Sequence, residues 1–126
     1  MLTHLCIAAA DLAASKSFYD AVLPPLGFAS VGQINERCCV YAADTGKILL
    51  MTPFDGQPAT ASNGSMVGLE AASKEVVDAW HAAGLAHGGS DEGAPGPRPN
   101  APGNAYGAYL RDPLGNKLSA FAQLPE

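Results

Sequence analysis

The two halves of this chain repeat one pattern at an offset of 62 residues. The recurring positions are an apolar strand residue, a helix start, an aromatic residue on a helix face, a leucine near the helix end and a glycine beyond it. These pairs are Leu5 with Val67, Asp11 with Ser73, Phe18 with Trp80, Leu23 with Leu85, and Gly27 with Gly89. The repeat predicts two copies of one supersecondary unit, because each copy alone is too small to bury a core.

Each half opens with an apolar run of strand length, at residues 2–8 and 66–71, and a helix is expected after each run. Asp11 and Ser73 are the predicted N-caps, since their side chains can accept hydrogen bonds from the free amides of the first turn. Residues 24–25, both proline, should end the first helix, and glycines at 84 and 88–89 the second.

Short strand-like runs follow each helix. In the first half they cover residues 28–33, 37–43 and 47–52, and in the second half the clearest ones are 105–111 and 117–123. Residues 112–116 (Asp-Pro-Leu-Gly-Asn) have the preferences of a type I turn closing a hairpin. Turn chemistry therefore explains Asp112 and Asn116 as structural residues, while Arg111 can pair with an acidic neighbour.

The sequence thus predicts an α+β fold of two βαβββ modules, about 1–60 and about 64–126, in a single domain spanning 1–126. A curved mixed sheet built from both modules should enclose a concave cup. Because each half has a thin core, we expect a hydrophobic interface and a homodimer. Residues 90–104, rich in glycine and proline, are expected to form an irregular loop that is either functional or disordered, with a short strand near Gly89.

Composition excludes several classes of function. Seven Lys and Arg against twelve Asp and Glu give a net charge of -5, which offers no basic field for nucleic acid. No apolar run has the roughly 20 residues needed to span a membrane, and no signal peptide is recognisable, so a cytoplasmic protein is expected. Cys6, Cys38 and Cys39 have no metal-site spacing and are expected to be reduced and partly buried.

Three stretches resemble the vicinal oxygen chelate superfamily, which includes glyoxalase I, bleomycin-resistance and fosfomycin-resistance proteins and extradiol dioxygenases. They are residues 4–20, residues 23–28, and residues 109–118 with the sequence Tyr-Leu-Arg-Asp-Pro-Leu-Gly-Asn-Lys-Leu. The resemblance covers nearly the whole chain and implies paired βαβββ modules around a cup that often holds a divalent metal. It is specific for the fold and weak for the function, because this fold supports several chemistries.

The resemblance also implies where metal ligands would lie. The family's four ligand positions fall on His4, near Leu50, on Met66 and on Ser119, which are expected to line the cup, and only His4 is a plausible ligand. The repeat superposes His4 on Met66, so these two side chains should face each other inside the cup. An alkyl chain and a thioether do not hold Mg, Mn or Zn, and a neutral hydroxyl is a poor substitute for a carboxylate. We therefore expect no complete metal site. The alternatives for His4 are a hydrogen-bonded strand histidine, a residual ligand, or an acid-base group.

Other polar residues could line the cup. Arg98 could clamp a carboxylate or phosphate, or make a surface ion pair. Tyr106 and Tyr109 are separated by an odd number of positions on one strand, so they should point to opposite faces, with one of them in the cavity. Cys6 shares a face with His4 and is either a pocket thiol or a small buried residue. His81 and His87 are expected to face solvent.

Three functional hypotheses remain open at this point. The first is a protein that binds a small organic ligand in the cup, with an apolar lining and with His4, Ser119 and Arg98 orienting the ligand's polar groups. The second is a metal-dependent lyase, isomerase or dioxygenase using His4 with other ligands, for which Glu70 and Asp55 are the candidates. The third is an interaction module whose cup is filled or collapsed.

Overall fold

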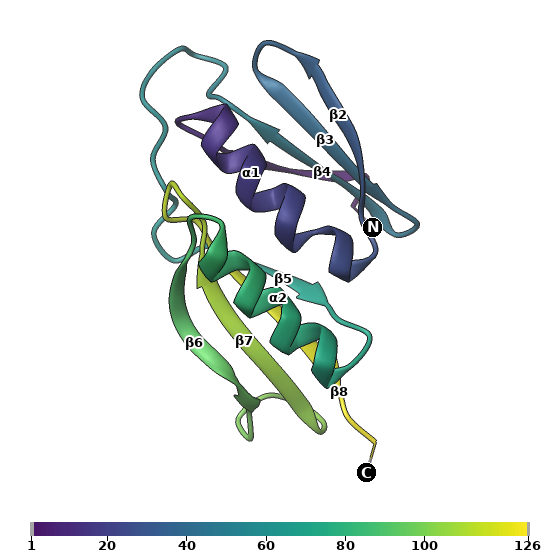
Figure 1. The fold of residues 1–126 in the computed structure, drawn as a ribbon. Coiled ribbons are helices and arrows are strands. Elements are labelled where there is room, and N and C mark those ends of the chain that lie inside the picture. The colour runs from purple at the N-terminus through teal and green to yellow at the C-terminus, as the bar shows by residue number, and fades with distance from the viewer. Residues whose placement is uncertain (1, 126) are drawn as a thin grey trace.

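The computed structural model describes residues 2–125, and its elements alternate as the repeat predicts (Figure 1). Each module contains a strand, a helix and three more strands. The first module comprises β1 (His4–Ala8), α1 (Leu12–Val22), the short 3-10 helix η1 (Pro24–Leu26), β2 (Ala29–Asn35), β3 (Cys38–Ala43) and β4 (Gly46–Met51). The second comprises β5 (Met66–Glu70), α2 (Lys74–Ala86), β6 (Ser90–Pro97), β7 (Ala105–Arg111) and β8 (Lys117–Gln123).

The strands form two four-stranded mixed sheets in equivalent order, β1-β4-β3-β2 and β5-β8-β7-β6. In each sheet the first strand runs parallel to the last, so His4 pairs with Lys47 and Met66 with Lys117. The α+β class and the two βαβββ modules are thereby confirmed. The expected curved sheet is divided into two, one per module.

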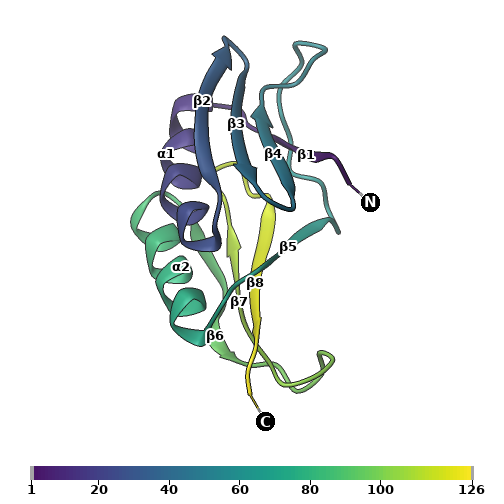
Figure 2. The same cartoon turned by 90° about the vertical axis from the view of Figure 1, so that its right-hand side faces the viewer.

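Both helices lie on the same side of the molecule, and the sheets turn their other faces away from them (Figure 2). The predicted caps form: the Asp11 carboxylate accepts from the backbone amide of Ala14, and the Ser73 hydroxyl from that of Val76. Helix α1 ends before Pro24, while Gly88 beyond α2 has a φ of 93°, a left-handed conformation that suits glycine.

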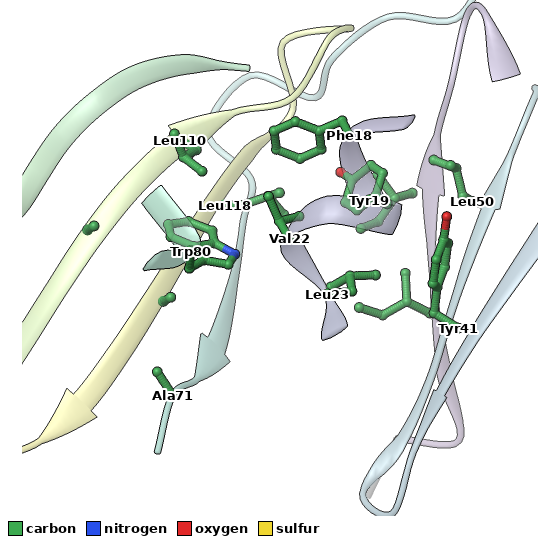
Figure 3. Packing of buried hydrophobic residues seen from close by; sticks show 14 of the residues in the cluster. Phe18, Tyr19, Val22, Leu23, Tyr41, Leu50, Ala71, Trp80, Leu110 and Leu118 are labelled. Atoms are coloured by element: carbon green, nitrogen blue, oxygen red, sulfur yellow. The ribbon is translucent and has the colours of Figure 1, made fainter. Parts of the chain in front are cut away.

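A single hydrophobic cluster joins the modules beneath the two helices (Figure 3). Phe18 and Tyr19 of α1 contribute fully buried rings, as does the equivalent Trp80 of α2. The two sheets supply the opposite wall with Tyr41, Leu50, Leu110 and Leu118. Neither module completes this core alone, which explains why the chain carries the repeat in duplicate.

The prediction of an irregular loop across residues 90–104 is wrong for its first half. Residues 90–97 form β6, which pairs antiparallel with β7 through two register shifts. A strand with several prolines and glycines is tolerated here because β6 is at the edge of its sheet, where one side of the backbone needs no partner. Within residues 2–125, no helix is both long and apolar enough to cross a membrane.

Candidate functional site

Each sheet has a face packed on the helices, here called the helix-proximal face, and an opposite helix-distal face. Side chains alternate between these faces along every strand. On β1, Ile7 belongs to the buried core, while His4 and Cys6 are exposed on the helix-distal face. On β5, Met66 and Glu70 are the corresponding exposed residues. The helix-distal faces are therefore the faces that a ligand can reach.

Leu50 does not belong to this site. It pairs with Ile7 and Cys39, is 0% exposed, and lies in the core among the residues of α1 (Figure 3). The expectation that Leu50 lines the cup is wrong, because side chains alternate along β4 and that of Leu50 points to the helix-proximal face. Its neighbours Leu49 and Met51 occupy the helix-distal face, across from Cys6 and Ala8.

His4 and Met66 line different clefts between the two modules. A cleft of about 280 Å³ is bordered by Cys6 and Met66 together with Lys117 and hydroxyl residues of the segment 60–65. A smaller cleft of about 130 Å³ contains His4, Lys47 and Leu69. His4 is thus nearer to the end of β5 than to its start, and the expected facing of His4 and Met66 is not found.

Tyr109 and Tyr106 point to opposite faces of β7, as predicted, and only Tyr109 lies on the helix-distal side. The Tyr106 hydroxyl donates to the Asp78 carboxylate of α2 at 2.6 Å, so Tyr106 is not the tyrosine that lines the cavity. That hydrogen bond and partial burial raise the pKa of Tyr106. Tyr109 instead packs edge-to-face against Phe121 of β8, with 5.7 Å between the ring centroids.

Ser119 also belongs to the helix-distal face, opposite Tyr109 on β7 and Gly68 on β5. It is 1% exposed, and its Oγ has no hydrogen-bond partner among the described residues. A Cβ added to Gly68 would come within 3.3 Å of this oxygen, a tight contact that the Ser119 side chain would have to relieve by a small shift. An unsatisfied buried hydroxyl is costly and calls for a partner such as water or a ligand atom.

Arg98 follows β6, and its side chain folds back over the sheet. Its guanidinium donates to the backbone carbonyls of Ala94, Gly96 and Pro97, and lies 5.5 Å from the centroid of the Tyr109 ring. The surface ion pair considered above is absent from the described residues. The three carbonyls fix the position of the cation without neutralising its charge.

Two residues of this face escaped the sequence analysis. Lys117 places its Nζ 5.2 Å from the centroid of the Tyr109 ring, and Phe121 packs against the same ring. Both could have been found by extending the alternation from Ser119, because residues 117, 119 and 121 of one strand share a face.

The cysteines also differ from expectation in part. The three thiols are free, as expected, and Cys38 and Cys39 are buried. Burial is the main cause that raises the pKa of both. Cys6 is exposed and borders the larger cleft, so its interpretation as a small buried residue is wrong.

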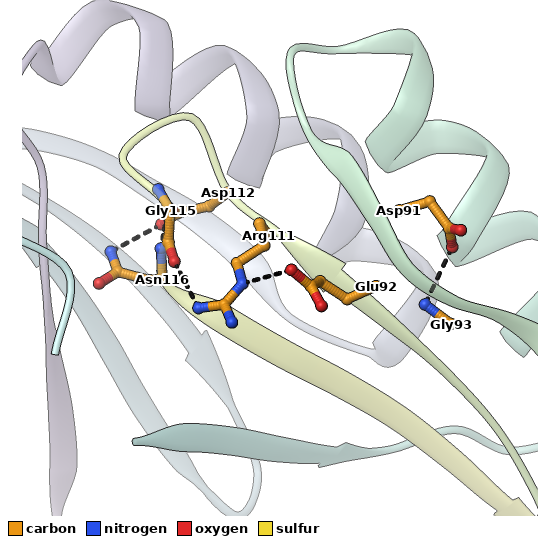
Figure 4. A network of polar contacts seen from close by, with 7 residues as sticks. All are labelled: Asp91, Glu92, Gly93, Arg111, Asp112, Gly115 and Asn116. Atoms are coloured by element: carbon orange, nitrogen blue, oxygen red, sulfur yellow. Dashed lines mark hydrogen bonds and ion pairs between the residues drawn. The ribbon is translucent and has the colours of Figure 1, made fainter. Parts of the chain in front are cut away.

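The turn between β7 and β8 is a structural centre, as predicted (Figure 4). The Asp112 carboxylate accepts from the backbone amides of Leu114, Gly115 and Asn116, while the Asn116 amide donates to Asp112 and to the carbonyl of Ala8. Arg111 pairs with Glu92 at 2.8 Å, which confirms the expected acidic neighbour.

The two remaining histidines lie outside the site. His81 is 8% exposed, and its Nε2 lies 2.8 Å from the Asp91 carboxylate, so the expectation that it faces solvent is wrong. The hydrogen bond from His81 is the main cause that lowers the pKa of Asp91. His87 is exposed, and its Nδ1 donates to the carbonyl of Ala83 at the end of α2.

The residues at the implied metal positions do not suit a divalent ion. His4 is one imidazole, Leu50 is in the core, and Met66 and Ser119 carry a thioether and a neutral hydroxyl. Between residues 2 and 125, no cluster of three or more His, Cys, Asp or Glu side chains could hold a metal ion. We derive no chemical step through such an ion.

The sequence-family model of the Glyoxalase/Bleomycin resistance protein/Dioxygenase superfamily matches residues 1–119. The chain belongs to this superfamily. A glyoxalase/bleomycin resistance protein from Albidiferax ferrireducens T118 is similar to it, with 44% identity, a TM-score of 0.89, and coverage of 98% of this chain and 99% of that one. No match was found among curated proteins.

More distant superfamily members share the architecture. A putative glyoxalase from Bacillus halodurans has 25% identity and a TM-score of 0.74, covering 97% of this chain and 95% of its own. A lactoylglutathione lyase from Agrobacterium tumefaciens has 23% identity and a TM-score of 0.68, with coverage of 97% and 92%, and shows the fold alone. The superfamily is thus established, and its fold supports several chemistries.

Proposed function

We propose that this superfamily member binds a small organic molecule at its helix-distal faces without the metal set of metal-using relatives. The observation that carries the proposal is the cleft of about 280 Å³ between the modules, whose lining combines apolar Met66 and Val67 with polar Lys117 and Cys6. Ligand sites in proteins commonly have such an apolar lining with a few polar groups that orient the ligand.

Sequestration or transport of the ligand is the role that these residues support. His4, Ser119 and Arg98 remain as orienting groups around the clefts, with Met66 and Tyr109 as lining side chains. Binding needs only complementary shape and a few placed polar atoms, whereas the metal-dependent reactions of this fold need an ion with open coordination positions.

The test is a titration of the ¹⁵N-labelled protein with a library of small aromatic and aliphatic compounds, followed by amide chemical shifts. We expect at least one class of compound to shift residues of β1, β5, β7 and β8 that border the helix-distal faces. Shifts confined to the surface of α1 and α2, or no saturable shifts at all, would overturn the proposal.

A metal-dependent lyase, isomerase or dioxygenase is the second candidate function. It is supported by the placement of Glu70, which is exposed on the helix-distal face and borders a cleft that shares Phe28, Thr45 and Leu69 with the cleft of His4. Asp55 is a weaker candidate, because its carboxylate accepts from the amide of Gln57 in the segment after β4. Paramagnetic broadening by Mn²⁺ centred on His4 and Glu70 would favour this function.

We further propose that the protein is a homodimer. Large apolar side chains are exposed on several elements, among them Val31 and Ile34 on the edge strand β2 and Met66 on β5. Covering such residues in an isologous interface would remove apolar surface from water. Light scattering coupled to size-exclusion chromatography tests this, with a mass of two chains expected and a monomer contradicting it.

A further inference from the structure

Two cations converge on one aromatic ring of the helix-distal face. The Arg98 guanidinium carbon lies 5.5 Å and the Lys117 Nζ 5.2 Å from the centroid of the Tyr109 ring, so the two charges are no farther apart than the sum of these distances. They come from opposite neighbours of β7, since Arg98 follows β6 and Lys117 begins β8. Both positive charges therefore lie close to Tyr109.

Neither cation is neutralised by a carboxylate of residues 2–125. The ion pairs within residues 2–125 involve Lys16, His81 and Arg111 as the basic partners. Glu92 on this side forms an ion pair with Arg111. Glu70 lies four residues along β5 from Met66, the residue that pairs with Lys117. That spacing is roughly 13 Å at the rise of an extended strand.

The concentration of charge here contrasts with the rest of the molecule. The chain has a net charge of -5, yet two of its seven basic residues, Arg98 and Lys117, lie beside one tyrosine with no ion-pair partner among residues 2–125. A positive region on an acidic protein attracts anions selectively, because the surrounding surface repels them.

Space and an unused hydrogen-bonding group accompany these charges. Lys117 borders the cleft of about 280 Å³, together with Thr60, Ser62 and Met66. The Ser119 hydroxyl, which has no hydrogen-bond partner among residues 2–125, lies two residues along the same strand, opposite Tyr109. Reaching its Oγ requires a shift of the side chains that cover it, after which an anion oxygen can accept its hydrogen bond.

We propose that this face binds a small organic anion, with its carboxylate or phosphonate group at Lys117 and Arg98 and its apolar part in the cleft beside Met66. This inference rests on the proposed function and names the class of ligand. Both cations suit the role: Lys117 is free to turn toward the ligand, and Arg98 is preorganised by its three carbonyl contacts.

Benzoate, phenylphosphonate and neutral benzamide are the probes, added to the ¹⁵N-labelled full chain. Benzoate and phenylphosphonate should shift the amides of residues 109 and 117–121, and benzamide should bind about tenfold more weakly or worse, because a charged hydrogen bond is lost. Raising the salt concentration from 0.05 to 0.5 M should weaken the binding of the two anions several-fold and leave the binding of benzamide unchanged.

Lys117→Met removes the charge while keeping the length of the side chain. We expect it to weaken benzoate binding about tenfold or more, and Lys117→Arg to retain most of the affinity. The matched control is Lys74→Met, because Lys74 also lies over a tyrosine of β7, with its Nζ 5.5 Å from the centroid of the Tyr106 ring, but on the α2 side. Lys74→Met changes the net charge equally and should bind benzoate normally.

Several outcomes would overturn the inference. Equal affinity for benzoate and benzamide, or equal loss in the Lys117→Met and Lys74→Met variants, would exclude anion recognition by Lys117. If neither anion binds but neutral compounds of the library bind at the cleft, this inference is overturned and the proposed function is retained. If no compound binds, both this inference and the proposed function are overturned. Thermal unfolding of each variant confirms that it is folded.

Discussion

The Tyr19 hydroxyl of α1 donates a 2.6 Å hydrogen bond to the Asp112 carboxylate of the turn between β7 and β8. This buried contact joins the first module to the second. The Asn116 amide completes the link by donating to Asp112 and to the Ala8 carbonyl of β1. The family-like turn thus fixes how the modules sit together, and through them the clefts that both modules border.

Removing the Tyr19 hydroxyl should loosen this link. Tyr19→Phe should lower the free energy of unfolding by about 1–2 kcal/mol, because a buried acceptor loses a charged hydrogen bond while the backbone amides still satisfy it in part. Urea denaturation measures the change. Tyr106→Phe is the control, since it removes a phenol-carboxylate bond of equal length within one module. A smaller loss is expected there, and an equal or greater loss would contradict the role assigned to Tyr19.

Stability should fall above pH 10 because of the buried tyrosines. Burial raises the pKa of Tyr19 well above its usual value of 10.0, with the Asp112 charge adding to the effect, and burial also raises the pKa of Tyr41. Above pH 10 the unfolded chain releases these protons while the folded chain keeps them, so the free energy of unfolding decreases as the pH rises. Phenolate absorbance at 295 nm should therefore show Tyr19 and Tyr41 ionising together with unfolding. Ionisation of all the tyrosines near pH 10 in the folded protein would contradict this.

The glycine beneath Phe121 should be intolerant of a side chain. A Cβ at Gly107 would come within 2.7 Å of the Phe121 ring, so Gly107→Ala should destabilise the protein by about 1–3 kcal/mol and displace the ring from Tyr109. Gly68→Ala is the milder comparison, because its Cβ would meet the Ser119 Oγ at 3.3 Å. Thermal unfolding and the Phe121 ring resonances measure both effects. Equal melting temperatures for wild type and Gly107→Ala would show that the ring has room to move.

One thiol should react in the folded protein. Cys6 is exposed, whereas burial covers Cys38 and Cys39 and raises the pKa of both thiols. A disulfide reagent such as DTNB should titrate one thiol rapidly at neutral pH and three after unfolding, and Cys6→Ser should abolish the rapid phase. Rapid reaction of two or more thiols would contradict the assigned burial.

The repeat made most of the fold predictable from the sequence. The positions of Asp11, Ser73, Phe18 and Trp80 predict two helices with their caps and buried faces, and the Asp112 turn predicts the last hairpin. The edge strand β6 could not be predicted, because its prolines and glycines argue against a strand unless its place at the sheet edge is known.

The candidate site was less predictable because it depends on register and on side-chain direction. Leu50 lies in the core, whereas its chain neighbours Leu49 and Met51 lie on the helix-distal face. An error of one residue in the register of β4 therefore exchanges the two faces. Likewise, the capture of His81 by Asp91 depends on the approach of β6 to α2, and local sequence does not reveal that approach. The convergence of Arg98 and Lys117 on Tyr109 brings together β7, β8 and the residue that follows β6, so it could be seen only in the structure.

The central claim is that this superfamily member keeps its ligand-binding faces without a functional metal set. The most direct test is the metal content of protein purified without chelators, dialysed against Zn²⁺, Mn²⁺, Ni²⁺ and Fe²⁺ in turn and analysed by elemental mass spectrometry, with His4→Ala as the comparison. We expect well below one ion per chain and the same trace content in both proteins. One ion per chain that is lost in His4→Ala would contradict the account.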